Sequence, residues 1–555
     1  MKRQPTELEQ RRFDVVIIGG GITGAALAFD AADRGLVTAL IDKGDFGAAT
    51  SAASSKLLHG GLRYLQNLAF GKVRESALER MYFQNLVPHQ TRYVPFVVPT
   101  YRGLSRGRAL LSAGMLAYET LCLGQNRHVR DRGKRVPSGR SLTAAEVRNV
   151  IPGVRASGLT GGRLFYESHM HSSERVTLAF IDGAARKGAC VANYVVSDRF
   201  LLEQGRVVGV QATDRLSGHR LTVRGRLILN AAGPWIRQLN EQLGGRTLSG
   251  IVTGFSKGAH IVTRPLTAGH AVALPTQRRN QAVIHRGGRH VFIIPWRGKS
   301  LIGTTYGPYE GDLDAVGATA ADVAELIDDV NAALGPQTLS PDDVLYSYAG
   351  LYPLVQADID PEVYQGTGDY QVVDHEAVDG VPGLLSVFGA KYTTARLLAE
   401  RTLDLVSRKL GDDLSPCRTR KLALPAGEIV DLDRFRAERY EQYRDLLSAQ
   451  QVNHLITAYG AAAVSVVALA QEMPELIEPL ASDRDTLALE AIWATRHEMA
   501  VHLEDFVFRR TGLGTLGDPG TEALRRAAEI MGGELGWDTE RRNEEIERVA
   551  ARFAA

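Results

Sequence analysis

Cysteine is scarce in this chain, with three residues among 555. Cys122, Cys190 and Cys417 lie far apart and form no C-x-x-C pair, which argues against a zinc site, an iron–sulfur cluster and a disulfide framework. We therefore expect no bound metal. An excess of one charge is also absent, because 65 Lys and Arg stand against 63 Asp and Glu. This balance, with 7% aromatic residues, is not typical of a nucleic-acid binder or a disordered chain, and it suits a globular enzyme.

Long hydrophobic runs are missing as well. Residues 1–14 contain no apolar stretch of the kind that a secretory signal needs, and no segment approaches the roughly 20 uninterrupted apolar residues of a spanning helix. We therefore expect a cytoplasmic protein. One segment, ALLSAGMLAYETLCL at residues 109–123, is more apolar than a surface helix should be, although it is too short to span a membrane. It is either a core helix or, with Arg106, Arg108 and Arg127 nearby, a shallow contact on the inner face of the cytoplasmic membrane.

The first recognisable feature of the sequence is a strand–turn–helix–strand pattern at residues 13–43, FDVVIIGGGITGAALAFDAADRGLVTALIDK. Residues 15–18 are a β-branched run, as in a parallel strand that is buried on both faces, and residues 36–41 are the second strand. The turn between them has the spacing G-x-G-x-x-G. This context predicts a dinucleotide-binding βαβ unit.

Each residue of the motif has a separate physical role. Gly19 permits the turn, Gly21 lets a pyrophosphate approach the backbone, and Gly24 lets the helix pack on the strand. The helix N-terminus then presents unpaired N–H groups to the phosphates. Asp42 follows at the distance from which a carboxylate can accept hydrogen bonds from ribose hydroxyls. A second copy of the spacing, GLGTLG at residues 512–517, follows a helix expected over 487–508 rather than a strand, and we interpret it as a loop.

The residues after Asp42 favour FAD over NAD. An NAD enzyme normally continues through further regular strand–helix units, whereas residues 44–65 (GDFGAATSAASSKLLHGGLRYL) are rich in small, hydroxylic and glycine residues. Such a segment can offer hydroxyl and N–H groups to the polar atoms of an extended flavin. A second signal is LILNAAGPW at residues 227–235, where a strand expected over 221–229 ends in small residues and Gly233.

With these motifs in view, the sequence resembles the FAD-dependent glycerol-3-phosphate dehydrogenases, which belong to the D-amino-acid-oxidase-like flavoprotein group. The resemblance runs from residue 13 to the C-terminus, and its most specific pieces are IIGGGITGAALAFDAADRG, TSAASSKLLHGGLRYL, SERVTLAF, LNAAGPW, KGAHIV, VFIIPW, LIGTT and LLSVFGAKYTTAR. It implies a mixed α/β fold with a Rossmann-like FAD-binding domain, an antiparallel-sheet substrate domain and a C-terminal helical domain. It also implies hydride transfer from a secondary alcohol to FAD, which converts glycerol 3-phosphate into dihydroxyacetone phosphate, with the electrons passing to a quinone or, in oxidase relatives, to oxygen.

The same motifs imply a set of site residues. The catalytic set is His260, Arg63 and Lys391, and the substrate-binding set is these three with Tyr64 and Tyr352. An arginine fork matches phosphate oxygens, and a histidine can take a hydroxyl proton near neutral pH. The residues assigned to the cofactor are Gly19, Gly21, Ile22, Thr23, Gly24, Asp42, Lys43, Thr50, Ser51, Ser54, Ser55, Leu58, His59, Gly60, Gly61, Ala232, Gly233, Gly389, Lys391, Tyr392, Thr393 and Thr394.

The chain departs from the family pattern where the substrate phosphate should bind. Tyr352 and Gly368 stand at positions where the family has arginines, Tyr306 replaces an acid after G-T-T, and Ala390 replaces a glycine. Each lost charge-assisted contact is worth about 1.5–3 kcal/mol. The arginines that could substitute are Arg63, Arg92, Arg102, Arg286 and Arg396.

Length predicts several structural units, because 555 residues exceed one ordinary core. The expected ranges are 12–75, 170–248 and 366–412 for the FAD-binding domain, 76–169 and 249–365 for the substrate domain, and 425–555 for the C-terminal helical domain. In the substrate domain, residues 290–295 and 300–304 should be antiparallel strands. The C-terminal domain has no catalytic constellation, so we expect a structural or dimer-forming role and a core built from Leu489, Ile492, Trp493, Leu503, Phe506 and Val507.

Three functional hypotheses remain open. The leading one is a flavin dehydrogenase of glycerol 3-phosphate or a close polyol phosphate that passes its electrons to quinone. The departures at Tyr352 and Gly368 motivate the second, an FAD-dependent oxidase or dehydrogenase of a non-phosphorylated alcohol or amine. The third is a catalytically silent flavoprotein.

Overall fold

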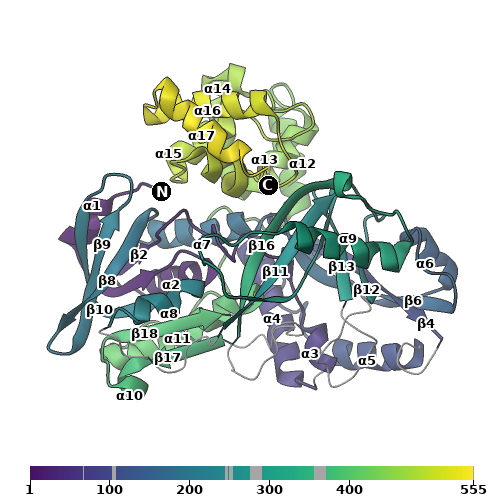
Figure 1. Ribbon diagram of the computed structural model, residues 1–555, viewed down its shortest axis with the longest axis horizontal. Helices are drawn as coiled ribbons and strands as arrows, with labels where there is room; N and C mark the ends of the chain where they lie inside the picture. Colours follow the sequence, from purple (N-terminus) through teal and green to yellow (C-terminus); the bar gives the residue numbers. More distant parts are fainter. Residues whose placement is uncertain are drawn as a thin grey trace.

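The computed structural model describes residues 1–66, 68–102, 108–243, 248, 254–275, 290–354, 370–389 and 391–553; of residues 63, 66 and 108–113 it describes the backbone only. Three parts are visible in Figure 1: a sheet with helices on the left, a second sheet on the right, and a helical domain above both. The mixed α/β fold expected from the sequence is confirmed.

The first sheet has the path β17-β18-β10-β1-β2-β7, with the β8–β9 hairpin attached to β10. Strand β1 lies in its middle and pairs in parallel with β2 and β10, so the dinucleotide-type arrangement of the first strand is confirmed. The strands are β1 (Arg12–Ile18), β2 (Thr38–Ile41), β7 (Cys190–Ala192), β8 (Val195–Glu203), β9 (Arg206–Asp214), β10 (Arg220–Asn230), β17 (Tyr370–Asp374) and β18 (Leu384–Gly389).

Helix α2 (Ile22–Asp33) packs between this sheet and two further helices, α7 (Ser173–Arg186) and α11 (Ala395–Leu410). Its alanines allow this close packing, and nearly all its residues are buried. Three short helices lie around the same sheet: α1 (Pro5–Gln10), α8 (Ile236–Asn240) and α10 (His375–Asp379).

The second sheet has the path β15-β11-β14-β13-β12-β4-β6-β3, with β16 on β11 and β5 on β6. Its strands are β3 (Leu57–Leu58), β4 (Thr91–Tyr101), β5 (Arg140–Leu142), β6 (Leu159–Met170), β11 (Gly254–Thr263), β12 (Ala271–Pro275), β13 (His290–Trp296), β14 (Lys299–Gly303), β15 (Gly307–Tyr309) and β16 (Val344–Leu354). The expected β13–β14 antiparallel pair is confirmed. Strand β3 lies inside the range 12–75 yet joins this second sheet, because it pairs with β6.

Helices border the second sheet on its outer side: α3 (Leu62–Gln66), α4 (Phe70–Leu86), α5 (Arg108–Leu121), α6 (Ala144–Val150) and α9 (Ala320–Leu334). Helix α5 is amphipathic. Met115 and Tyr118 are buried in the core, whereas Leu116 is 66% exposed. Leu123, just beyond its end, is 68% exposed. One face of this segment therefore belongs to the core, and Leu116 and Leu123 are exposed.

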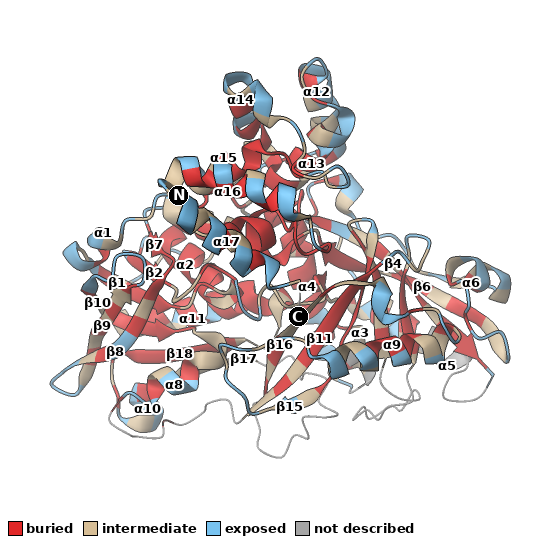
Figure 2. Cartoon of the chain, turned by 45° about the horizontal axis from the view of Figure 1, so that its top comes forward, coloured by how far each residue is buried: buried red, intermediate tan, exposed pale blue. Residues whose placement is uncertain are grey.

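The C-terminal domain consists of α12 (Leu432–Tyr443), α13 (Ala449–Tyr459), α14 (Ala463–Glu472), α15 (Leu489–His497), a π-helix (Asp505–Arg510), α16 (Thr521–Leu535) and α17 (Thr539–Ala550). In Figure 2 the faces of α15 and α16 that meet the rest of the domain are buried, while much of α12 and α14 faces solvent. Of the six expected core residues all are buried except Trp493, which is half-buried.

The helix expected over 487–508 is wrong, because the chain leaves helical conformation between α15 and the π-helix. Met499 adopts a left-handed φ of 56°. The Asp505 carboxylate accepts hydrogen bonds from the N–H groups of Val501 and His502, both at 2.9 Å, and so restarts the helix. Residues 512–517 are irregular, as expected for the second glycine motif.

One helical stretch of 24 residues, formed by α13, a 3-10 turn and α14, is long and apolar enough to cross a membrane by length and composition. Gln450, Asn453 and His454 interrupt its apolar run in the sequence. Most of its apolar window, 61%, is buried inside the protein. Its residues Leu455 and Val466 belong to the core of the C-terminal domain.

Candidate active site

A cavity of about 1300 Å³ lies where the two sheets and the C-terminal domain meet. This exceeds the roughly 300–1,000 Å³ of ordinary ligand pockets, so it can hold a dinucleotide and a small substrate together. Its walls come from the glycine turn after β1, the segment 42–45 and 47–57, residues 231–235 after β10, residues 388, 389, 391 and 392, and strands β11 and β16.

The three motif glycines play different roles. A Cβ on Gly24 would stand 1.8 Å from the Gly19 carbonyl oxygen, so Gly24 permits helix–strand packing and does not line the cavity. Gly19 has a φ of +102° and lies against the Ala231 backbone. Gly21 has an ordinary φ of −70°, and a Cβ there would meet only Ser51 Oγ, at 3.1 Å. Gly21 is therefore the glycine at which a side chain would enter the cavity.

The region around Gly21 suits a pyrophosphate. Gly21 is the N-cap of α2 and supplies no side-chain cap, and Gly21, Ile22 and Thr23 all line the cavity. The Ile22 N–H donates to Ser51 Oγ at 2.9 Å, which orients that hydroxyl. A helix N-terminus with no acidic residue in its first turn attracts an anion.

Asp42 lies at the adjoining edge of the cavity. Its Oδ2 accepts a hydrogen bond from the Gly20 N–H at 2.6 Å, and its Oδ1 accepts one from the Gly44 N–H at 2.8 Å. Burial raises the pKa of Asp42 to about 6, against the lowering effect of these two bonds. Each carboxylate oxygen retains a lone pair for a ribose hydroxyl.

Lys43 covers the same end of the cavity. Its ammonium lies 3.8 Å from the centre of the Trp235 ring and contacts the Asp314 carboxylate. Trp235 and Asp314 also line the cavity, together with Ala232 and Gly233. The indole Nε1 of Trp235 is buried without a hydrogen-bond partner among the described residues.

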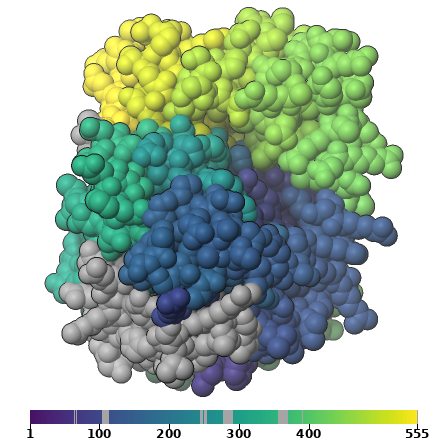
Figure 3. Space-filling model, turned by 90° about the vertical axis from the view of Figure 1, so that its right-hand side faces the viewer, coloured from purple at the N-terminus to yellow at the C-terminus, as the bar shows by residue number. Residues whose placement is uncertain are grey.

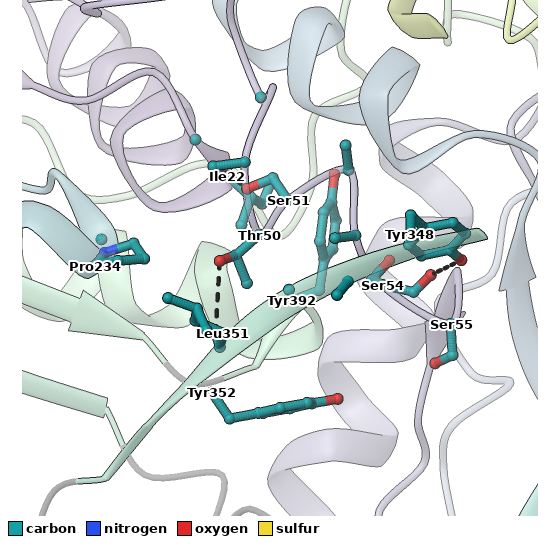
Figure 4. A pocket seen from close by; sticks show the side chains of 18 of the residues that line it. Ile22, Thr50, Ser51, Ser54, Ser55, Pro234, Tyr348, Leu351, Tyr352 and Tyr392 are labelled. Carbon is teal, nitrogen blue, oxygen red and sulfur yellow. Dashed lines mark hydrogen bonds between the residues drawn. The ribbon is translucent and has the colours of Figure 1, made fainter. Parts of the chain in front are cut away.

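The serine-rich segment runs beside β16, as Figure 4 shows. Thr50 Oγ1 donates to the Leu351 carbonyl at 3.5 Å, and Tyr348 OH donates to the Ser54 carbonyl at 2.6 Å. Ser51, Ser54 and Ser55 line the cavity. The segment is therefore held from behind while its hydroxyl groups remain available to a flavin.

Not every residue assigned to the cofactor lines the cavity. Those that do are Gly19, Gly21, Ile22, Thr23, Asp42, Lys43, Thr50, Ser51, Ser54, Ser55, His59, Gly61, Ala232, Gly233, Gly389, Lys391 and Tyr392. Those that the structure places behind it are Gly24, Leu58, Gly60, Thr393 and Thr394. Leu58 packs in the core, and the Gly60 N–H donates to Glu167 Oε2 at 2.6 Å. The Thr393 hydroxyl is buried without a partner among the described residues.

His260 lies on β11 and lines the cavity with 2% of its surface exposed. Its ring stacks on Tyr348, with centroids 5.1 Å apart and planes at 15°. Its other side packs on Gly303, where a Cβ would stand 2.3 Å from the imidazole. Burial, with a smaller effect from the Lys56 charge, lowers the pKa of His260 to about 3. The imidazole is therefore neutral, and its Nδ1 has no hydrogen-bond partner among the described residues.

Lys391 follows β18 and also lines the cavity. Its ammonium donates to Ser76 Oγ at 2.6 Å and lies 4.6 Å from the centre of the Tyr64 ring, so Lys391 and Tyr64 are adjacent. Tyr352 lines the cavity beside Tyr306, with ring centroids 6.1 Å apart. The side chain of Arg63, and Gly368 and Ala390 altogether, lie outside the described residues, so the roles assigned to them stay predictions.

Of the arginines considered as substitutes, the three whose side chains are described do not line this cavity. Arg396 pairs with Glu79 at 2.5 Å and with Glu400 at 2.7 Å in a buried cluster. Arg92 donates to the Pro295 carbonyl, and Arg102 is exposed. Neither lines the cavity, and Arg286 lies outside the described residues.

Sequence reasoning missed Lys56 and Glu174, which both line the cavity. The Lys56 ammonium donates to Glu174 Oε1 at 2.6 Å and lies 5.7 Å from the centre of the Tyr348 ring. Burial lowers the pKa of Lys56, and Glu174 opposes this shift. The available signal was a lysine that directly precedes two buried leucines, since a charge in such a place needs a partner.

Among the described residues, no group of three or more His, Cys, Asp or Glu side chains could hold a metal ion.

Comparison with known protein families gives two matches. A model described as FAD dependent oxidoreductase matches residues 14–405, and one described as the C-terminal domain of alpha-glycerophosphate oxidase matches residues 417–542.

Individual relatives cover nearly the whole chain. A glycerol-3-phosphate dehydrogenase of Synechocystis sp. is 32% identical over 553 residues, which are 98% of this chain and 96% of that protein. A glycerol-3-phosphate dehydrogenase 2 of Mycobacterium tuberculosis is 33% identical over 564 residues, covering 100% of this chain and 89% of that one. The crystal structure of a glycerol-3-phosphate dehydrogenase from Bacillus halodurans in complex with FAD matches with a TM-score of 0.78 and 28% identity, covering 99% of this chain and 95% of that one.

Proposed function

Since this chain belongs to the FAD-dependent oxidoreductases, in the branch of the glycerol-3-phosphate dehydrogenases, we propose that it oxidises glycerol 3-phosphate or a close polyol phosphate to the corresponding ketone, dihydroxyacetone phosphate for the former. The observation that supports this proposal most directly is that one cavity contains both the glycine turn and the residues with reactive side chains. Gly21 and Asp42 line the end that suits the dinucleotide, and His260 and Lys391 line the same continuous space.

The residues present fit FAD. The turn at Gly19 and Gly21 and the N-terminus of α2 would hold the pyrophosphate, Asp42 the ribose, and residues 50–55 the flavin side. When bound, FAD supplies the acceptor for the hydride of the substrate C–H bond.

The chain's own residues supply the proton chemistry. The neutral His260 imidazole can accept the proton of the substrate hydroxyl, because it is uncharged at working pH and lines the cavity. The stack on Tyr348 and the contact with Gly303 fix the plane of that ring. Lys391 places a positive charge beside Tyr64, where it can stabilise the negative charge that develops during oxidation.

The non-phosphorylated alternative has its own supporting observation. At the family arginine position the chain has Tyr352, which lies beside Tyr306. A tyrosine hydroxyl can donate a neutral hydrogen bond, but it brings no positive charge of its own to a phosphate dianion.

Anaerobic mixing of the purified flavoprotein with candidate substrates tests the proposal. We expect glycerol 3-phosphate to bleach the flavin absorbance. Bleaching by glycerol or an amine but not by glycerol 3-phosphate would support the alternative. If dithionite reduces the flavin and no substrate does, the protein is a silent flavoprotein and the proposal fails.

Arg63→Lys tests the predicted phosphate contact. Lysine keeps the charge but loses the planar fork that matches phosphate oxygens, so we expect kcat/KM to fall about tenfold or more, with flavin content unchanged. Steady-state kinetics on protein of measured flavin content would show this. If the variant oxidises glycerol 3-phosphate as well as the wild type, Arg63 does not bind the phosphate.

For the electron acceptor we propose a quinone, with the protein cytoplasmic and peripheral on the inner face of the cytoplasmic membrane. A quinone is confined to the bilayer, so its partner must dock there. Helices α3, α4 and α5 contact one another at the lower right of Figure 1. Exposed apolar and basic residues of this region are Leu68, Phe70, Arg74, Leu116, Leu123 and Arg127. This combination supports shallow docking on anionic lipid.

Liposome flotation tests this docking. We expect Leu116→Glu combined with Leu123→Glu to abolish flotation with anionic vesicles, because two charges would enter the interface, while dye-linked dehydrogenase activity is retained. Leu216→Glu, at an exposed leucine of the β9–β10 turn, is the matched control and should float like the wild type. Equal flotation of the wild type, the double variant and the control would show that α5 has a structural role and does not dock on the membrane.

A homodimer formed through the C-terminal domain also stays a proposal, and sedimentation velocity on the purified protein tests it directly.

A further inference from the structure

The C-terminal domain forms part of the cavity wall as well as packing on the outside of the molecule. Its residues Phe508, Arg509, Thr515, Ala551 and Arg552 line the same cavity as the glycine turn. In Figure 3 this domain, yellow to light green, forms a continuous layer over the darker N-terminal parts. A domain expected to be structural therefore has direct access to the cofactor region.

The closest link between this domain and the cofactor region is made by Asp45, whose side chain is completely buried. Arg510 donates to both carboxylate oxygens, with Nη1 at 2.7 Å from Oδ2 and Nη2 at 2.8 Å from Oδ1. Arg509 Nε donates to Oδ2 at 2.6 Å, and Asn193 Nδ2 donates to Oδ1 at 3.0 Å. Asp45 therefore accepts four hydrogen bonds from side chains.

The cluster around Asp45 is balanced in charge. Arg509 also pairs with Asp505, whose carboxylate accepts a hydrogen bond from Tyr194 OH at 2.6 Å. Two buried carboxylates thus face two buried guanidinium groups. Burial opposes ionisation of Asp45, but the charges of Arg510 and Arg509 outweigh it and hold the pKa of Asp45 well below its usual range. Asp45 is therefore ionised in the folded protein.

On its other side, the loop that carries Asp45 holds the glycine turn. Asp42 accepts from the Gly20 N–H, and the Gly47 N–H donates to the Gly20 carbonyl at 3.0 Å. The ring of Phe46 packs so closely on Gly20 that a Cβ there would stand 2.5 Å from it. Residues 42–47 are thus fixed to the dinucleotide turn at one edge and to the C-terminal domain at the other.

We infer that Asp45 is a positioning residue through which Arg509 and Arg510 of the C-terminal domain hold residues 42–47 against the glycine turn, so that this domain sets the affinity of the protein for its flavin dinucleotide. The inference rests on the binding of FAD and is independent of the identity of the substrate. It assigns the C-terminal domain a function in cofactor retention in addition to any role in assembly.

The test compares FAD dissociation constants of apoprotein variants with their thermal stabilities. Asp45→Asn removes the carboxylate that faces Arg510, and Arg510→Gln removes two of the four hydrogen bonds to Asp45 together with one of its two positive partners. Each variant should therefore bind FAD about 30-fold more weakly or worse. Glu490→Gln is the matched control. The Glu490 carboxylate is also fully buried in the C-terminal domain, where it contacts His454 Nε2 and Tyr459 OH, both at 2.8 Å. Its contacts among the described residues include neither residues 42–47 nor Arg509 and Arg510. We expect this control to lose stability while its FAD affinity stays within about threefold of the wild type, because it leaves the loop in place.

The double variant separates positioning from a general loss of stability. If Asp45 and Arg510 act as one unit, Asp45→Asn with Arg510→Gln should bind FAD no more weakly than either single variant. Arg510→Lys, which keeps the charge but not the fork, provides a folded protein with an intermediate affinity should the glutamine variant not fold. Wild-type FAD affinity in folded Asp45→Asn or Arg510→Lys would overturn the inference. So would a loss of affinity that merely follows the loss of stability in all variants, Glu490→Gln included.

Discussion

Replacement of Gly21 by valine is expected to give a folded but colourless protein. The backbone at Gly21 has a φ of −70° that valine can adopt, and its Cβ would meet only Ser51 Oγ, at 3.1 Å. The fold should therefore tolerate the substitution, while the branched side chain fills space that the pyrophosphate needs. Overpacking costs about 1–3 kcal/mol, and loss of charge-assisted bonds to the phosphates adds about 1.5–3 kcal/mol for each bond, so the FAD dissociation constant should rise by about 10³ or more.

Flavin content per mole of purified protein, with circular dichroism to confirm folding, measures this effect. Gly71→Val is the matched control, since Gly71 lies in the first turn of α4 and a Cβ there meets no atom within 4 Å. That control should remain yellow. A Gly21→Val protein that keeps full flavin occupancy would show that the pyrophosphate lies elsewhere.

His260→Asn is expected to lower kcat/KM by about 10²–10⁴, the range for loss of a general base, without loss of flavin. Asparagine keeps a polar group on β11 but cannot accept the substrate proton in the same way. His219→Asn, in the exposed turn between β9 and β10, is the control and should have wild-type kinetics. If His260→Asn is as active as the wild type, the base is another residue.

The pH dependence provides a second readout for His260. Its pKa is lowered from 6.5 to about 3, so the folded protein keeps it neutral across pH 5–8. We therefore expect no fall of kcat/KM from its protonation in that window. In the unfolded chain the imidazole takes up a proton as the pH drops below about 6.5, so its burial lowers the free energy of unfolding progressively from that pH downward. An acid limb near pH 6.5 that disappears in His260→Asn would show that the pKa of His260 is not lowered in the folded protein.

Local sequence patterns identified the parts of the site that depend on local conformation. The glycine spacing before α2 predicted a turn and a helix N-terminus because only glycine permits the turn at Gly19 and the close packing at Gly24. Two neighbouring strands and the acidic residue Asp42 then indicated a dinucleotide-binding site. The same reasoning failed between α15 and the π-helix, where carboxylates that contact distant residues interrupt a helical pattern.

Tertiary structure decided which charged groups remain available to ligands. Arg396 looked suitable for a phosphate, yet it is neutralised by Glu79, which lies more than 300 residues away in the sequence. Lys56 was overlooked, although its burial beside Glu174 places it in the cavity wall. Ion pairing depends on distances in space, and no spacing along the chain encodes them.

The sequence by itself therefore determined the order of strands and helices around the glycine turn, and the choice of FAD, since both follow from contiguous motifs. Only the tertiary structure decided that His260 stacks on Tyr348, that Lys391 lies beside Tyr64, and that Arg510 reaches Asp45 across 465 residues. The physical reason is that turns and helix ends are set by backbone sterics within a few residues. Buried charges, in contrast, are stable only where the whole fold brings their partners within hydrogen-bonding distance.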